Sequence, residues 1–117
     1  MLKVRRDWGW YRTIIRLPFF CIKILKFEPF CALSYQKHRY RNEFWCMIKG
    51  FGHIRLHKKD WVLSYPMVQC FDTALIKRDV WHIFSNENEP SYFLEVQWGP
   101  YVSEYDIERK YRHEQKG

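Results

Sequence analysis

Apolar and polar residues alternate in a series of short runs along most of this 117-residue chain. A period of two residues is typical of β-strands, because successive side chains of a strand point to opposite faces of the sheet. Such runs recur about every ten residues, and this spacing predicts an antiparallel sandwich or barrel. The runs predicted as strands cover residues 8–15, 19–27, 31–36, 43–48, 53–57, 61–65, 73–76, 81–84 and 92–98.

Turn residues separate these runs, and helical patterns are nearly absent. Gly50 and Gly52 suit a hairpin turn between the fourth and fifth runs. Only residues 104–114 have helical composition, so Tyr105 and Ile107 are expected to pack a short C-terminal helix against the barrel. We therefore predict an all-β fold, with one domain over residues 1–117 and a barrel from about residue 8 to residue 99.

Composition narrows the class of protein. Hydrophobic residues make up 47% of the chain and aromatic residues 20%, which predicts a folded domain rather than a disordered one. The sequence shows no apolar run of about 18 residues to cross a membrane and no export signal. The four cysteines form no Cys-x-x-Cys pair, so we interpret them as reduced thiols in a cytoplasmic protein. The net charge of +7 favours an anionic partner.

Four polar residues form a candidate metal site. Gln36 and His38 are two residues apart and would share one face of a strand, and Glu43 follows after a short polar turn. His82 comes about 40 residues later on another predicted strand. One amide, two imidazoles and one carboxylate suit Zn, Fe, Mn or Co with positions left open for a substrate. The spacing alone leaves open a polar surface stripe instead.

Two other predicted strands carry polar side chains that face either the solvent or the interior of the barrel. His53 and His57 flank Arg55 opposite two apolar residues, which is typical of a solvent-facing stripe. Glu95 and Gln97 share a strand face, which either is exposed or points into the barrel. If it points inward, Glu95 is a candidate general base, and Glu43 is the other candidate.

The order and spacing of several motifs resemble the cupin domain of type II mannose-6-phosphate isomerases, within the cupin superfamily. A Gln-x-His-x4-Glu segment is followed by a Trp-His-x3-Asn segment, as in the two cupin motifs. In place of the family's consecutive histidines and Pro-x-Gly turn, this chain has single His38 and Lys77-Arg78-Asp79. The matching segments are residues 6–11, 33–38, 41–45, 76–86, 94–99 and 104–109.

The resemblance implies a cupin jelly-roll barrel and a site. The implied ligands of one divalent metal are Gln36, His38, Glu43 and His82, with zinc preferred over Fe, Mn, Co or Ni. Arg41 and Arg109 match the family's arginines, and a guanidinium suits a phosphate or an enediolate. The implied activity is the isomerisation of mannose 6-phosphate to fructose 6-phosphate through a cis-enediol, by a homodimer.

Two other classes of function stay open at this stage. The first is a non-catalytic cupin that binds a sugar phosphate or a nucleotide sugar. The second is a β-barrel that binds nucleic acid, which the net charge and the many aromatic residues suggest. We disfavour the second, because aromatic residues such as Trp45 and Trp81 lie inside the cupin-like motifs, where core packing explains them.

Overall fold

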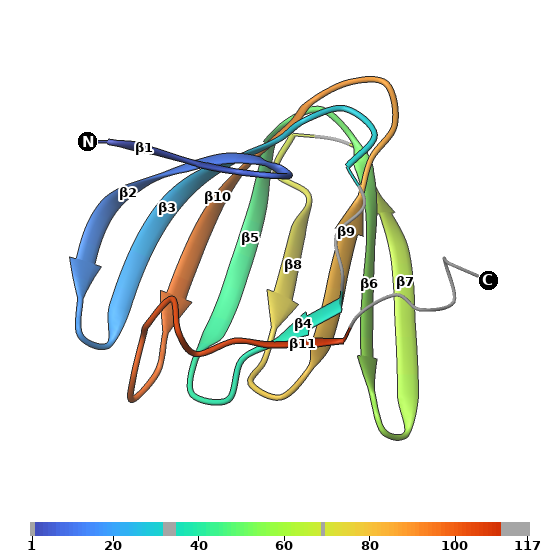
Figure 1. Cartoon of the computed structure of the whole chain (residues 1–117). Helices are drawn as coiled ribbons and strands as arrows, with labels where there is room; N and C mark the ends of the chain where they lie inside the picture. Colours follow the sequence, from blue (N-terminus) through green and yellow to red (C-terminus); the bar gives the residue numbers. More distant parts are fainter. Residues whose placement is uncertain (1, 32–34, 69, 111–117) are drawn as a thin grey trace.

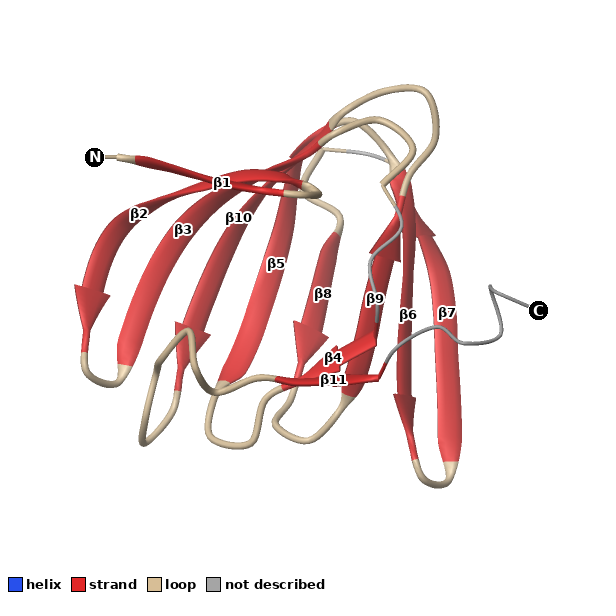
Figure 2. Ribbon diagram, viewed as in Figure 1, coloured by secondary structure: helices blue, strands red, loops and turns tan. Residues whose placement is uncertain are grey.

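The computed structural model describes residues 2–31, 35–68 and 70–110. These residues form eleven strands in two antiparallel sheets that face each other (Figure 1). The described part of the chain contains no helix (Figure 2), and so no helix in it is long and apolar enough to cross a membrane.

The larger sheet has six strands, and the last long strand of the chain lies in its interior. In spatial order the strands are β1 (Lys3–Arg6), β2 (Gly9–Leu17), β3 (Phe20–Phe27), β10 (Ser91–Trp98), β5 (Asn42–Lys49) and β8 (Thr73–Ile76). Strand β10 pairs with β3 on one side and β5 on the other. Residues far apart in the sequence therefore lie side by side on the inner face of this sheet.

The smaller sheet has five strands and closes the other side of the barrel. Their spatial order is β11 (Glu108–Lys110), β4 (Tyr35–Lys37), β9 (Trp81–Ser85), β6 (Gly52–Lys58) and β7 (Trp61–Met67). The short strands β4 and β11 lie across the lower end of the barrel in Figure 1. This arrangement confirms the all-β architecture and nearly all of the predicted strands.

The predicted C-terminal helix is wrong over residues 104–110, and residues 111–114 lie outside the described part of the chain. The segment before β11 is fastened by contacts from distant strands. The Asp106 carboxylate accepts hydrogen bonds from the backbone N–H groups of Arg39 and Tyr40 (both 2.9 Å), and Glu104 forms ion pairs with Lys23 and Arg16. These tertiary contacts keep the segment in a non-helical conformation. Residues 108–110 then pair with β4 as a strand.

The interior has an apolar half and a polar half, and both follow from strand register. Phe93 on β10 packs in the apolar half, with its ring centroid 5.0 Å from that of Phe84 and 5.3 Å from that of Trp45. Two and four residues further along the same face of β10 stand Glu95 and Gln97, which are also buried. The aromatic half fixes the positions of the strands, and the polar half forms the site.

Core truncation provides a first prediction. Ile54 is fully buried on β6, whereas Ile48 on β5 is 43% exposed. Replacing Ile54 by valine should lower the free energy of unfolding by about 0.5–1.5 kcal/mol, because one buried methylene is lost and the packing cannot close over the gap. Ile48→Val is the matched control and should change it by less than about 0.5 kcal/mol. Urea unfolding of both variants measures the difference, and equal effects would contradict the described core.

Candidate functional site

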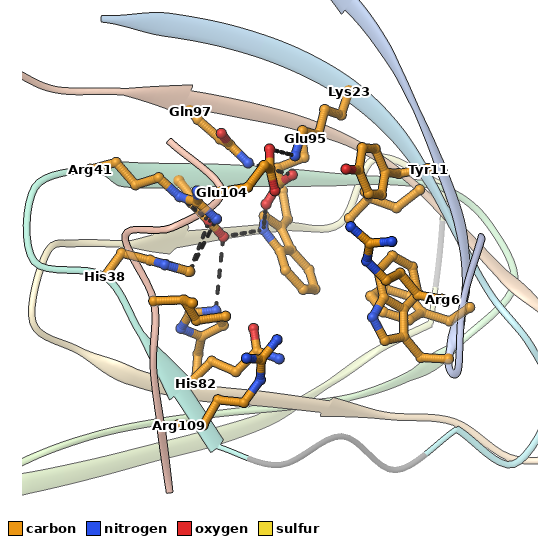
Figure 3. A pocket seen from close by; sticks show the side chains of 17 residues that line it. Arg6, Tyr11, Lys23, His38, Arg41, His82, Glu95, Gln97, Glu104 and Arg109 are labelled. Carbon is orange, nitrogen blue, oxygen red and sulfur yellow. Dashed lines mark hydrogen bonds and ion pairs between the residues drawn. The ribbon is translucent and has the colours of Figure 1, made fainter. Parts of the chain in front are cut away.

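A cavity of about 140 Å³ lies between the two sheets in the polar half of the barrel. Its lining comes from both sheets and from the segment before β11, and Figure 3 shows these side chains converging on one space. The residues predicted as the site all line it: Gln36, His38, Arg41, Glu43, His82, Glu95 and Arg109.

Three potential metal ligands meet at one wall of the cavity. Strand alternation turns Glu43 inward at the start of β5, and His82 faces inward on β9. His38, directly after β4, completes the group. One ligand atom from each of the three side chains lies within 4.8 Å of the others, and all three side chains are buried. Such a cluster of two imidazoles and a carboxylate can hold a divalent metal ion.

Backbone contacts orient both imidazoles toward the carboxylate. Nδ1 of His38 lies 2.6 Å from the carbonyl oxygen of Asp106, and Nδ1 of His82 lies 3.3 Å from that of Val80. A carbonyl oxygen only accepts, so each Nδ1 is the donor. The Nε2 atoms then face Glu43, at 3.1 Å for His38 and 3.8 Å for His82. A backbone carbonyl on the second ring nitrogen is the usual arrangement of metal-binding histidines.

The charge states of Glu43 and His82 also suit the binding of a metal ion. Burial lowers the pKa of His82 to about 4, so its imidazole is neutral at pH 7. Burial alone would raise the pKa of Glu43, but His38 and Arg41 beside it hold that pKa well below its usual range. The Nε2 lone pair of the neutral His82 imidazole faces the ionised carboxylate of Glu43. This contact is repulsive unless a cation lies between the two groups. The donor set therefore fits a divalent cation.

The remaining predicted site residues lie around this cluster. Gln36 is paired with His82 across β4 and β9, and it lines the cavity. Nε of Arg41 donates to Oε2 of Glu43 at 2.9 Å, and its Nη1 donates to the carbonyl oxygen of Ser103 at 2.7 Å. Arg109 is paired with Gln36 in β11 and lines the cavity from the rim. The structure thus brings all seven predicted site residues to one cavity.

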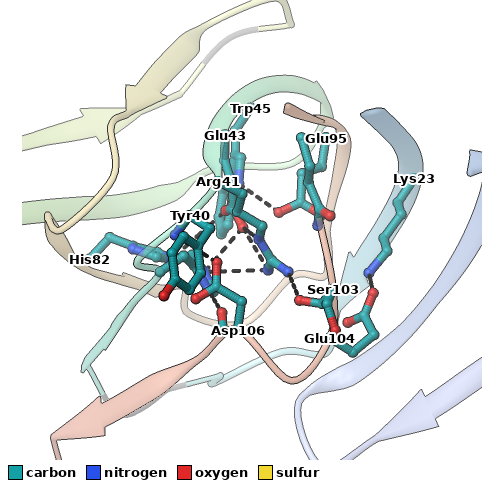
Figure 4. A network of polar contacts seen from close by, with 12 residues as sticks. Lys23, Tyr40, Arg41, Glu43, Trp45, His82, Glu95, Ser103, Glu104 and Asp106 are labelled. Atoms are coloured by element: carbon teal, nitrogen blue, oxygen red, sulfur yellow. Dashed lines mark hydrogen bonds and ion pairs between the residues drawn. The ribbon is translucent and has the colours of Figure 1, made fainter. Parts of the chain in front are cut away.

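Glu95 lines the same cavity, beside Glu43. Nε1 of Trp45 donates to both carboxylates, at 3.0 Å for Oε1 of Glu43 and 3.1 Å for Oε2 of Glu95 (Figure 4). Burial and the neighbouring charge of Glu43 raise the pKa of Glu95 to about 8. Two adjacent carboxyl groups therefore differ in charge at neutral pH, with Glu43 ionised and Glu95 largely protonated.

Sequence reasoning missed four charged or amide side chains that also line this cavity: Arg6, Lys23, Gln97 and Glu104. Lys23 is the clearest case, since it is buried on β3 with Nζ 4.2 Å from the Tyr11 ring centroid. In the sequence, Lys23 shares the alternating strand face of Cys21 and Leu25, which point inward. That pattern could have identified it as a buried charge. Gln97 was placed on a shared face with Glu95, but the sequence did not show that this face is the inner one.

The ion pairs of Glu104 give a prediction about pH. Burial raises the pKa of Glu104, but Lys23, Arg16 and the charge of Arg41 outweigh it, so that the net pKa lies below the ordinary value. A lowered pKa stabilises the fold above the unfolded-state pKa, and this contribution disappears as pH falls through the folded-state pKa. Glu104→Gln should therefore lower Tm at pH 7, and the difference from the unsubstituted protein should shrink below about pH 4. Calorimetry across pH checks this, and a difference independent of pH would contradict it.

Comparisons with known proteins show which families and folds the chain resembles. Residues 1–112 match the family model described as "Mannose-6-phosphate isomerase C-terminal". The chain is 33% identical over 108 residues to the xanthan biosynthesis protein XanB of Xanthomonas campestris pv. campestris, and 29% identical over 108 residues to a mannose-1-phosphate guanylyltransferase of Escherichia coli. Each alignment covers 92% of this chain and 22% of the relative, so the chain spans about a fifth of the length of these proteins.

Solved structures support the fold. The oxalate decarboxylase of Bacillus subtilis aligns with a TM-score of 0.79 at 15% identity, over 92% of this chain and 29% of that one. Another structure of that enzyme is described by its Mn(II) centres. A cupin domain of Schizosaccharomyces pombe Cnp3 aligns with a TM-score of 0.68 at 9% identity, over 77% of this chain and 64% of that one. The fold is therefore that of a cupin. Because the family match covers nearly the whole chain, the chain belongs to the mannose-6-phosphate isomerase C-terminal family.

Proposed function

We propose that this cupin is a metal-dependent aldose–ketose isomerase that converts mannose 6-phosphate to fructose 6-phosphate. The observation that carries the proposal is the pairing of two features in one cavity. Three ligand atoms lie within 4.8 Å of one another, and a buried carboxyl group with a raised pKa lies next to them. Isomerisation needs both, because a proton must move between C2 and C1 while negative charge develops on the adjacent oxygens.

His38, Glu43, His82 and Gln36 would hold one divalent metal, zinc first among Zn, Fe, Mn, Co and Ni. The bound metal would supply a Lewis acid for the oxygens on C1 and C2 of the sugar. Gln36 belongs to this set because its register partner is His82, so that both side chains start from adjacent strands on the same side of the sheet. Burial of the three other residues excludes most water from the site.

Glu95 would transfer the proton between C2 and C1. A pKa near 8 lies close to neutral pH, so both the acid and the base form of this carboxyl are accessible during the reaction. Trp45 and Gln97 donate to its two oxygens, at 3.1 Å and 3.0 Å, and fix the orientation of the carboxyl group. The same carboxyl can then remove a proton from C2 and return it to C1 of the cis-enediol.

Arginines would bind the charged parts of the substrate. Arg109 on β11 and Arg6 on β1 are exposed at the rim, and both line the cavity (Figure 3). Their guanidinium groups can bind a phosphate with paired hydrogen bonds. Arg41 is buried beside Glu43 and would donate to the enediolate oxygen. The homodimer expected from the sequence stays a prediction.

The alternative function is a non-catalytic cupin that binds a sugar phosphate or a nucleotide sugar. The contact between Arg41 and Glu43 favours it, because Nη2 of Arg41 lies 2.8 Å from the same carboxylate oxygen that contacts His38. A guanidinium at this place competes with a metal for Glu43. In this alternative, Arg41 keeps the carboxylate neutralised and no metal is needed for ligand binding.

Metal analysis and a coupled assay distinguish these two functions. The purified protein is stripped with a chelator, reloaded separately with Zn²⁺, Mn²⁺, Co²⁺ and Fe²⁺, and assayed for fructose 6-phosphate formation from mannose 6-phosphate. The proposal predicts about one bound metal per chain and activity that disappears on stripping and returns on reloading. Binding of mannose 6-phosphate without turnover in any metal form would support the alternative instead.

A further inference from the structure

Gln97 carries a polar atom that nothing in the described part of the chain satisfies. Its side chain is 1% exposed and lines the cavity, and its Oε1 is buried without a hydrogen-bond partner there. Leaving a buried acceptor unpaired costs about 1–3 kcal/mol, so native proteins keep such groups rare. An unpaired acceptor at the wall of a cavity indicates a place where a ligand donates a hydrogen bond.

The neighbours of Gln97 fix the direction of its amide. Nε2 donates to Oε1 of Glu95 at 3.0 Å, so Oε1 is directed away from Glu95. The opposite assignment of the amide atoms would only exchange the roles, because Nε2 would then be the unpaired buried atom. In both assignments one hydrogen-bonding atom of Gln97 is left for a ligand.

The surroundings select the chemistry of that ligand. On the inner face, Gln97 stands opposite Glu43 on β5 and opposite Cys21 on β3, and Glu95 precedes it by two residues on its own strand. An anion would be repelled by the ionised Glu43 on this wall. A hydroxyl group is neutral and can donate to one neighbour while it accepts from another. Lys23, opposite Glu95 on β3, supplies such a donor, since its ammonium has three N–H groups and Glu104 is its ion-pair partner.

We infer that Gln97 and Lys23 form a hydroxyl-binding subsite that selects polyhydroxylated ligands beside the metal centre. The inference rests on the proposed function, in which the metal and the arginines anchor the ligand. It adds the residues that recognise the hydroxyl groups of the sugar chain. A site that hydrogen-bonds a ligand hydroxyl discriminates strongly against an analogue without it, because the analogue leaves the buried polar groups unpaired. Gln97 is thus a specificity-determining residue, distinct from the predicted metal ligands.

Two unreactive phosphates test the inference by calorimetric titration of the zinc-loaded full chain. Mannitol 1-phosphate carries hydroxyl groups along its six-carbon chain, whereas hexyl phosphate has the same chain length and no hydroxyl group. The unsubstituted protein should bind mannitol 1-phosphate at least tenfold more tightly. Gln97→Met, of similar volume, should remove most of that preference while it leaves hexyl phosphate affinity and zinc content within twofold. Gln97→Asn shortens the side chain by one methylene, withdraws the amide from the ligand and should have the same effect. This second variant is used if Gln97→Met does not fold.

Each result bears on the inference separately from the proposed function. Equal preference for mannitol 1-phosphate in the unsubstituted protein and in the Gln97 variants overturns the subsite and leaves the isomerase proposal standing. Loss of zinc from Gln97→Met also overturns it, because Gln97 would then be a metal ligand. If the unsubstituted protein binds zinc but neither phosphate, the subsite and the proposed substrate class both fail.

Discussion

Replacing Glu95 by glutamine should lower the turnover of mannose 6-phosphate by roughly 10²–10⁴-fold, which is the usual contribution of a positioned general acid–base. Glutamine has nearly the same shape but cannot exchange a proton at this position. Because Glu95 is not among the predicted metal ligands, the variant should retain its metal. The effect should fall on kcat rather than on KM, since the substrate would still be anchored through the arginines and the metal.

The matched control for Glu95→Gln is Glu108→Gln, which changes an exposed carboxyl group on β11. This control should keep full turnover. Steady-state kinetics on both variants, with metal content measured on the same samples, makes the comparison. Turnover of Glu95→Gln within about threefold of the unsubstituted protein would show that another group moves the proton.

Replacing His82 by alanine should weaken metal binding by well over tenfold, because the ion loses one of two imidazole ligands. His82 is buried, neutral at pH 7 and 3.8 Å from Glu43 through Nε2, so the variant removes a ligand without removing a charge. Metal content after dialysis against a fixed concentration of free zinc measures the effect.

His53→Ala is the control for this experiment. His53 is exposed on β6, where its Nε2 contacts Oγ of Ser64 on β7 at 2.5 Å, and it is not among the residues that line the cavity of the predicted ligands. This variant should bind zinc as the unsubstituted protein does. If His82→Ala retains full zinc while His53→Ala loses it, the predicted ligand set is wrong.

Local pattern was sufficient to predict most of the strands, and the failures have physical causes. Strand β1 was not predicted because Lys3, Arg5 and Arg6 are exposed at a sheet edge and show no apolar alternation. The helix expected after residue 104 does not form, because Glu104 and Asp106 are held by partners that lie more than 60 residues earlier in the chain. Local composition carries no information about such partners.

The site was predicted in part for a related reason. Motif spacing identified the histidines and Glu43, because alternation fixes which residues share a strand face. It could not decide which face of β10 points inward, since Leu94 and Val96 alternate with Glu95 and Gln97. The apolar residues of this stretch face outward and are only half-buried, whereas the polar pair is buried. A polar cavity reverses the usual rule that the apolar face of a strand forms the core.

Proton exchange at the sugar carbons tests the central claim most directly. Mannose 6-phosphate is incubated in D₂O with the zinc-loaded protein and with the chelator-stripped protein, and deuterium at C1 and C2 is followed by NMR. An isomerase that works through a cis-enediol and Glu95 predicts fructose 6-phosphate with deuterium at C1 in the loaded sample alone, and far slower incorporation in Glu95→Gln. Fructose 6-phosphate without any solvent deuterium would contradict exchange at Glu95, and its absence from every metal-loaded sample would contradict the isomerase function itself.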